Sequence, residues 1–178
     1  MRIGRVGTPG LLLVITLAAL LGAKSAADKP AAPPGGGPQE AEVTGVFVEP
    51  QSRQPFMALQ GKRDKRTVVL VIAPLEAERI AMLLQDVATP RPLTHDLILS
   101  VLAEVKASLS RIVITDLRND TYYAVLHLDV GGQARRVDSR PTDAVALALR
   151  AKVPILVEDR VFDKAERAMP KPGPSPHF

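Results

Sequence analysis

The chain has 178 residues, the size of one ordinary domain with a single hydrophobic core. Hydrophobic residues make up 46% of it and charged residues 24%, as in a soluble globular protein. Aromatic residues amount to 3% and tryptophan is absent, which disfavours a protein that grips single-stranded nucleic acid by base stacking. The formal net charge is +4, and the absence of cysteine excludes a disulfide framework.

The N-terminal segment is typical of a secretory signal peptide. Arg2 and Arg5 precede an apolar run at residues 11–23, and the small residues Ser25 and Ala27 follow it. We therefore expect cleavage after Ala27 and export to the periplasm or the extracellular space. An uncleaved anchor is the alternative, but the run is shorter than the ~18 residues of a spanning helix. Residues 1–27 carry three basic side chains and no acid, so cleavage would lower the net charge from +4 to +1. Global charge then gives little support for nucleic-acid binding.

The composition of the rest of the chain predicts one domain between two flanking segments. Residues 28–40 are rich in proline and glycine and have almost nothing to bury, which indicates a linker. Residues 170–178 have a similar composition and indicate a disordered tail. The domain is therefore expected over residues 41–169.

Strand-like apolar runs open this domain at residues 42–50, 56–60 and 67–74. Residues 68–72 are continuously apolar and mostly β-branched, which predicts an inner strand covered on both faces. The polar segment 61–66 predicts a hairpin turn. It carries the four cations Lys62, Arg63, Lys65 and Arg66, which either contact phosphate or form a solvated loop.

Two helices are expected next, over residues 75–88 and 94–107, with Thr94 as the N-cap of the second. Apolar residues recur at helical spacing in each and predict two core-facing stripes. The stripes are Ile80, Leu83, Leu84 and Val87 in the first helix, and Ile98, Val101, Leu102 and Val105 in the second. Pro90 and Pro92 separate the helices, because neither can continue one.

Strand patterns return at residues 111–117, 121–130 and 133–138, joined by polar or glycine-rich turns. A helix from Pro141 follows, and its six consecutive apolar residues, 144–149, predict burial on nearly all sides. A short strand at 154–159 and a helix at 160–169 end the domain. Hairpins at both ends with helices between them predict an α+β fold. We expect a mixed, largely antiparallel sheet with about four helices packed on it, in a single domain.

No strong catalytic signature is present: the sequence has no glycine-rich phosphate loop, no HExxH and no GxSxG. The candidates are carboxylates and His95, all at the ends of predicted elements. Glu76 lies four residues before Ile80 on the same stripe, and as a first-turn carboxylate it has either a structural or a functional role. His95 begins a helix, where the dipole disfavours its cationic form, so it is a base, a metal ligand or a satisfied helix-start residue. His127 lies in mid-strand, where a structural role is the simpler reading.

Charged residues surround the start of the buried helix. Pro141 suits a first helical turn, and Asp143 lies in that turn, where negative charge is stabilised. Ser139 or Thr142 is the expected N-cap. Arg140 and Asp143 either form a local ion pair or belong to the rim of an active site.

Three segments, at residues 74–98, 111–128 and 137–159, carry a resemblance to a known family. They contain RPLTHDL, ITDL and SRPTDAVALALR and resemble, in unbroken order, the successive blocks of the bifunctional nuclease (BFN) domain family, also catalogued as a domain of unknown function. The resemblance covers residues 42–168 and implies a nuclease, because plant members are regarded as acting on both DNA and RNA. The polar residues at matching positions are Glu76, Glu78, Arg91, Thr94, His95, Asp96, Thr115, Asp116, Arg140 and Asp143.

Two hypotheses follow. The first is a phosphodiesterase that cleaves DNA or RNA with Mg²⁺ or Mn²⁺ held by Glu76, Asp116 and Asp143. His95 would act as base or ligand and Arg140 would grip phosphate, so the catalytic residues would be His95, Asp143 and Arg140. The second is an exported, non-enzymatic binding or assembly module, with a homo-oligomer as one form, in which the same charges cap helices and pair locally.

Overall fold

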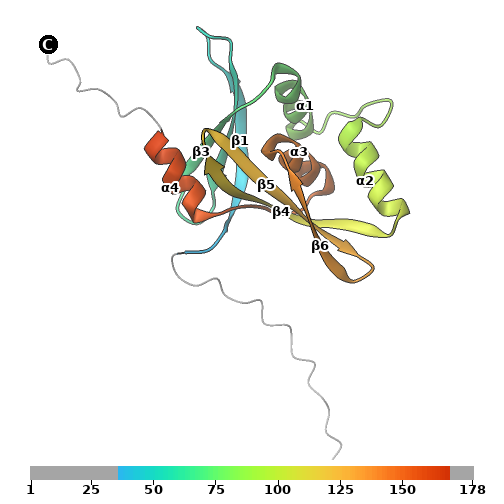
Figure 1. Cartoon of the computed structure of the whole chain (residues 1–178). Helices are drawn as coiled ribbons and strands as arrows, with labels where there is room; N and C mark the ends of the chain where they lie inside the picture. Colours follow the sequence, from blue (N-terminus) through green and yellow to red (C-terminus); the bar gives the residue numbers. More distant parts are fainter. Residues whose placement is uncertain (1–35, 169–178) are drawn as a thin grey trace, which may run out of the picture. The chain divides into compact units, whose positions relative to one another are not determined.

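The computed structural model of the chain describes residues 36–168 (Figure 1). The predicted signal peptide, most of the predicted linker and the predicted C-terminal tail lie outside these residues. The described strands are β1 (Gln39–Val48), β2 (Pro55–Gly61), β3 (Thr67–Val71), β4 (Ala107–Arg118), β5 (Thr121–Val130), β6 (Gln133–Ser139) and β7 (Ile155–Val157). The described helices are α1 (Pro74–Leu84), α2 (Thr94–Glu104), α3 (Pro141–Ala151) and α4 (Asp159–Ala168).

The strands form one mixed sheet in the order β3-β2-β1-β7-β4-β5-β6. Two antiparallel groups, β1–β3 and β4–β6, are joined by the short strand β7. Ile155 of β7 pairs with Ala41 of β1 in the antiparallel sense and with Ile112 of β4 in the parallel sense. The α+β prediction of a largely antiparallel mixed sheet with four helices is therefore confirmed.

The two hairpins of the β4–β6 group are closed by residues that adopt positive φ. Asn119 and Asp120 have φ of 47° and 59°, and Gly131 and Gly132 have φ of 59° and 81°. Two consecutive residues of positive φ match the right-handed twist of paired strands, which is why Asn, Asp and Gly are found in such turns. The predicted turns are thus found at both places.

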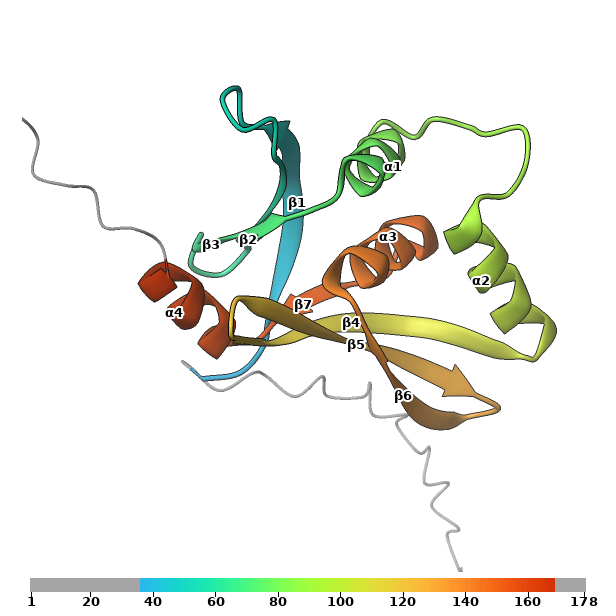
Figure 2. The ribbon, with the colours of Figure 1, turned by 45° about the horizontal axis from the view of Figure 1, so that its top comes forward.

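The helix predicted to be buried is the centre of the core. All residues from Ala144 to Ala148 of α3 are buried, and they pack with core residues of both strand groups, Met57 and Ile112 among them. Figure 2 shows α3 over β4 and β5, with α1 and α2 on either side of it. The small residues on α3 let neighbouring elements approach closely, so the N-terminal turn of α3 is held where three helices meet.

Three predictions about individual elements are wrong. β3 is an edge strand and not an inner one. Val68 and Leu70 face the core, whereas Val71 is 64% exposed on the other face. α1 ends at Leu84, because Asp86 turns the chain with a φ of 53°. Thr94 is the first residue of α2 and not its cap. Leu93 is the N-cap, and its N–H donates to the side chain of Asp96.

The predicted apolar stripe of α2 is also wrong in its direction. Val101 is 53% exposed, and Ile98 and Val105 are exposed as well. Leu99 and Leu102 are the α2 residues that pack against the core. Among residues 36–168, no helix is both long enough and apolar enough to cross a membrane.

Candidate active site

Four of the predicted site residues meet at the start of α3. The guanidinium group of Arg140 makes two contacts with Asp143, Nε–Oδ2 at 2.7 Å and Nη2–Oδ1 at 3.1 Å. Its Nη1 atom lies 3.0 Å from Oε1 of Glu76. The Nε2 atom of His95 lies 3.3 Å from Oδ1 of Asp143. We call these four residues the arginine cluster.

Each member of the arginine cluster is placed by a helix start. Arg140 is the N-cap of α3, with extended backbone, and neither Ser139 nor Thr142 caps this helix with its side chain, so the predicted caps are wrong. Glu76 lies in the first turn of α1, where it also accepts the N–H of Ala73 at 3.1 Å. Glu76, His95 and Asp143 thus lie in the first turns of three different helices.

A cleft with a volume of about 430 Å³ opens beside the arginine cluster. Its walls come from β3, the β4–β5 turn, the start of α1 and the start of α3. Glu76 and Arg140 line it, and the Arg140 side chain is 68% exposed. Across the cleft, the Tyr122 hydroxyl donates to the carbonyl of Val69 at 3.4 Å and so joins β5 to β3. The volume is within the range of small-ligand sites.

His95 and Asp143 lie on the inner side of the cluster. Together with Arg79 and Thr142 they line a small cavity of about 20 Å³. The His95 side chain is 18% exposed, against 33% for that of Asp143. The cluster therefore runs from an exposed guanidinium at the cleft to a half-buried imidazole behind it.

The charges of the cluster stabilise one another. Burial raises the pKa of Asp143, but hydrogen bonds from Arg140 and His95 outweigh it and hold that pKa below its ordinary value. The hydrogen bond to Asp143, with the negative charges of Asp143 and Glu76, raises the pKa of Arg140. Asp143 is therefore a carboxylate at neutral pH and accepts a hydrogen bond from whichever neighbour carries a proton.

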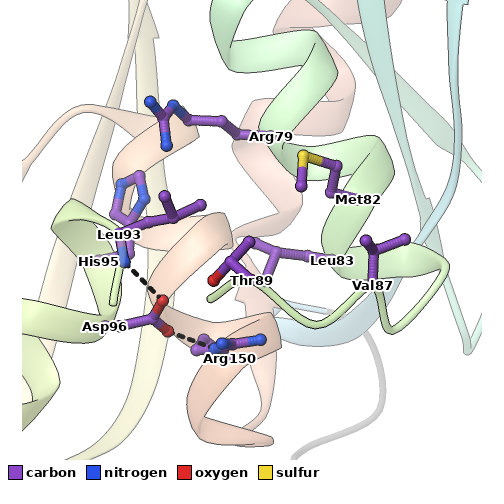
Figure 3. Close-up of a pocket in the computed structure, with 9 residues that line it drawn as sticks. All are labelled: Arg79, Met82, Leu83, Val87, Thr89, Leu93, His95, Asp96 and Arg150. Carbon is purple, nitrogen blue, oxygen red and sulfur yellow. Dashed lines mark hydrogen bonds and ion pairs between the residues drawn. The ribbon is translucent and has the colours of Figure 1, made fainter. Parts of the chain in front are cut away.

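A second pair of charges fixes α2 against α3. Asp96 forms an ion pair with Arg150 in the last turn of α3, and its other oxygen accepts the N–H of Leu93 at 2.9 Å. Figure 3 shows this pair beside a pocket with apolar walls, which Arg79 and His95 also line. Because Asp96 follows His95 directly, the ion pair sets the position of His95. Sequence reasoning did not single out Arg79 or Arg150.

Comparison with known proteins places the chain in a family. A family model described as the bifunctional nuclease domain matches residues 57–170. The chain belongs to the bifunctional nuclease domain family.

The uncharacterized protein Rv1829 of Mycobacterium tuberculosis strain H37Rv is 40% identical over 131 residues, which are 74% of this chain and 78% of that protein. Bifunctional nuclease 1 of Oryza sativa subsp. japonica and the bifunctional nuclease of Oryza minuta are each 28% identical over 120 residues. Those residues are 65% of this chain but 36% of each rice protein, so this chain corresponds to one part of them.

In this bifunctional nuclease domain, the structure does not bring Asp116 to the arginine cluster. Asp116 accepts hydrogen bonds from Lys164 at 2.6 Å, from Arg118 at 2.8 Å and from the N–H of Leu117 at 2.9 Å. The hydrogen bond from Lys164 is the main reason that its pKa falls to about 2. Asp116 thus joins β4 to α4 through a charged pair.

The predicted metal ligands do not fit a resident metal ion in this arrangement. Residues 36–168 contain no group of three or more histidine, aspartate or glutamate side chains that could hold one. Glu76 and Asp143 both bind Arg140, so a guanidinium lies where the two carboxylates converge. A metal ligand set of Glu76, Asp116 and Asp143 is therefore not assembled.

The remaining candidate site residues are either exposed to solvent or bonded to the backbone. Glu78, Arg91 and Thr94 are exposed, and the Thr115 hydroxyl donates to a backbone carbonyl.

The basic turn at residues 61–66 is largely neutralised within the chain. Lys62 pairs with Glu40, Arg63 with Asp159, and Arg66 with Asp64, Asp159 and Asp163. Three of its four cations are thus occupied without phosphate.

Proposed function

We propose that this domain hydrolyses phosphodiester bonds of DNA or RNA at the arginine cluster. The observation that carries the proposal is the sequence of contacts Arg140–Asp143–His95, which leads inward from Arg140 at the 430 Å³ cleft. It combines an exposed group that binds phosphate with a histidine oriented by a carboxylate. The rice relatives named bifunctional nuclease support the same reaction class.

His95 is proposed as the general base. If Nε2–H donates to Oδ1 of Asp143, the Nδ1 atom is free to accept a proton from water. A carboxylate that fixes the tautomer of a histidine in this way also stabilises the imidazolium that forms. Water then bonds to phosphorus, the ester P–O bond breaks, and the departing oxygen takes a proton from solvent. General base catalysis of this kind contributes about 10²–10⁴-fold to a rate.

Arg140 is proposed to hold the scissile phosphate. A guanidinium binds phosphate oxygens through two parallel N–H groups, and two of the Arg140 nitrogen atoms already bind a carboxylate in that manner. A phosphate that enters the cleft would compete with Asp143 and Glu76 for Arg140. The pairing in the free domain keeps the guanidinium at the cleft edge until the substrate arrives.

Dependence on a divalent metal is proposed on grounds of charge. With His95 neutral, the two carboxylates and one guanidinium of the cluster sum to −1, which opposes the approach of an anionic phosphodiester. Mg²⁺ often binds through one or two carboxylates together with substrate phosphate, not through a complete protein cage. We therefore propose Mg²⁺ or Mn²⁺ recruited with the substrate, and assign no step to the ion.

The test is cleavage of single- and double-stranded DNA and RNA by purified protein with Mg²⁺, Mn²⁺ or EDTA. Asp143→Asn should lower the cleavage rate by about 100-fold or more, since it removes the negative charge that pairs with Arg140 and orients His95. Glu78→Gln is the matched control, because Glu78 is exposed on α1 outside the cluster. Equal rates in the two variants, or no cleavage by the folded wild type under any condition, would remove the proposal. Cleavage that persists in EDTA would remove its metal part.

A different observation supports the alternative, a non-enzymatic binding or assembly module. Exposed Leu97, Ile98, Val101 and Val105 give α2 an apolar outer surface, of a kind that interfaces use. Light scattering of the purified protein measures whether it assembles. A well-folded oligomer without cleavage activity would favour this function over the nuclease.

Export is a further part of the proposal. It rests on the basic start, apolar run and small residues of positions 1–27, which the structure does not describe. The mass of the protein recovered from cells measures it: a chain that begins at Asp28 is expected outside the cytoplasm. A full-length chain that stays in the cytoplasm would contradict export.

A further inference from the structure

Two arginines and a histidine form a row across β4, β5 and β6. Arg111 of β4 is the register partner of His127 in β5, and His127 is the register partner of Arg136 in β6. Directly opposite residues of antiparallel strands have side chains on the same face. We call Arg111, His127 and Arg136 the basic row.

The basic row lies on the sheet face opposite to α2 and α3. Leu126 and Leu128, on either side of His127, are buried in the core with α3. Successive side chains of a strand point to opposite faces, so His127 and its two partners point away from α3. Figure 2 shows α2 and α3 on one side of these strands only. Arg111 and Arg136 are exposed, and His127 is half-buried between them.

Neither arginine of this row forms an ion pair within the described chain. The ion pairs of residues 36–168 include Arg63, Arg66, Arg118, Arg140, Arg150, Lys62 and Lys164, but neither Arg111 nor Arg136. Burial lowers the pKa of His127, and the positive charges of Arg111 and Arg136 lower it further, which places both guanidinium groups near the imidazole. An anion on the row would relieve all three groups at once.

We propose that the basic row binds the phosphate backbone of a nucleic acid. The inference rests on the proposed nuclease function, which makes nucleic acid the relevant polyanion, and it adds a second contact surface that shares no residue with the arginine cluster. Two guanidinium groups that flank an imidazole, one on each neighbouring strand, suit phosphates of a nucleic-acid backbone. Contacts to phosphate position a chain without reading bases, and the 2′-hydroxyl that distinguishes RNA from DNA is not needed for them. The row therefore fits an enzyme that accepts both nucleic acids.

The test is binding of a short fluorescein-labelled DNA strand with phosphorothioate linkages, which resist cleavage, measured by anisotropy over a range of salt concentrations. Each single-strand phosphate contact contributes about 0.7 to the slope of log affinity against log salt, so R111Q/R136Q should reduce that slope by about 1.4. R135Q is the matched control. Arg135 precedes Arg136 on the same strand, points to the other face and donates to Gln133.

A reduced slope in R111Q/R136Q and an unchanged slope in R135Q would support the basic row. Equal slopes in the two variants, or no binding by the wild type, would overturn it. NMR titration of His127 gives a second readout, because a bound phosphate should raise its pKa; an unchanged pKa at saturating DNA would overturn the proposal. Because the probe is not cleaved, binding is measured independently of cleavage. A wild-type protein that binds DNA through the basic row but cleaves no substrate would refute the proposed nuclease function and leave the basic row supported.

Discussion

The Nε2 atom of His95 lies 3.3 Å from Oδ1 of Asp143, although the two residues are 48 positions apart in the chain. The contact joins the first turn of α2 to the first turn of α3. It exists because α2 packs against α3. A histidine at the start of one helix is thus oriented by a carboxylate at the start of another.

Replacement of His95 by Asn is expected to lower the rate of phosphodiester cleavage by about 100-fold or more, because it removes the proposed base. Cleavage rates of the wild type and the variant measure this effect. A rate in His95→Asn close to that of the wild type would show that another group is the base.

Arg150 is expected to hold His95 in place through Asp96. Arg150→Met leaves the half-buried Asp96 carboxylate without its partner, so the free energy of unfolding should fall by about 1–3 kcal/mol. Cleavage should weaken as well, since the first turn of α2 loses its anchor. Urea unfolding measures the first effect. Arg91→Met is the control, because Arg91 is exposed in the loop before α2; equal stability of the two variants would contradict the anchor.

The spacing of apolar residues predicted most helices and strands, because side chains that face the core recur with the period of the helix or strand. It failed for α2, where two stripes overlap. Ile98, Val101, Leu102 and Val105 fit one face, but His95, Leu99 and Leu102 fit the adjacent face equally well. The structure uses the second, with Leu99 and Leu102 against the core and His95 against α3. Periodicity alone does not distinguish two faces that share a leucine.

The candidate site was predictable where its contacts are local. Arg140 and Asp143 are three residues apart at a helix start, and their pair follows from that spacing. The approach of Glu76 and His95 depends on how three helices pack, which single-sequence spacing does not encode. For Asp116 the sequence shows a carboxylate, but not that Lys164, 48 residues later, neutralises it.

Asp116 gives a prediction about acid stability. Its pKa of about 2 in the folded protein is below the ordinary value of 3.8, so its stabilising contribution is present above pH 4 and is lost as the pH falls toward 2. Lys164→Gln should raise this pKa, because the Lys164 hydrogen bond is its largest cause. NMR titration of the carboxyl carbon measures the shift. Lys65→Gln is the control, since Lys65 lies in the exposed turn between β2 and β3; an equal pKa in both variants would sink the prediction.

The direction of α2 can be tested by two truncations on neighbouring faces. Leu99→Ala should lower the free energy of unfolding by about 2 kcal/mol, because Leu99 packs against the core. Val101→Ala should change it by less than about 0.5 kcal/mol, since Val101 is 53% exposed. Urea unfolding of both variants measures the difference. A larger loss of stability in Val101→Ala than in Leu99→Ala would mean that the Val101 face is covered in solution. If that difference depends on protein concentration, the cover is another copy of the chain.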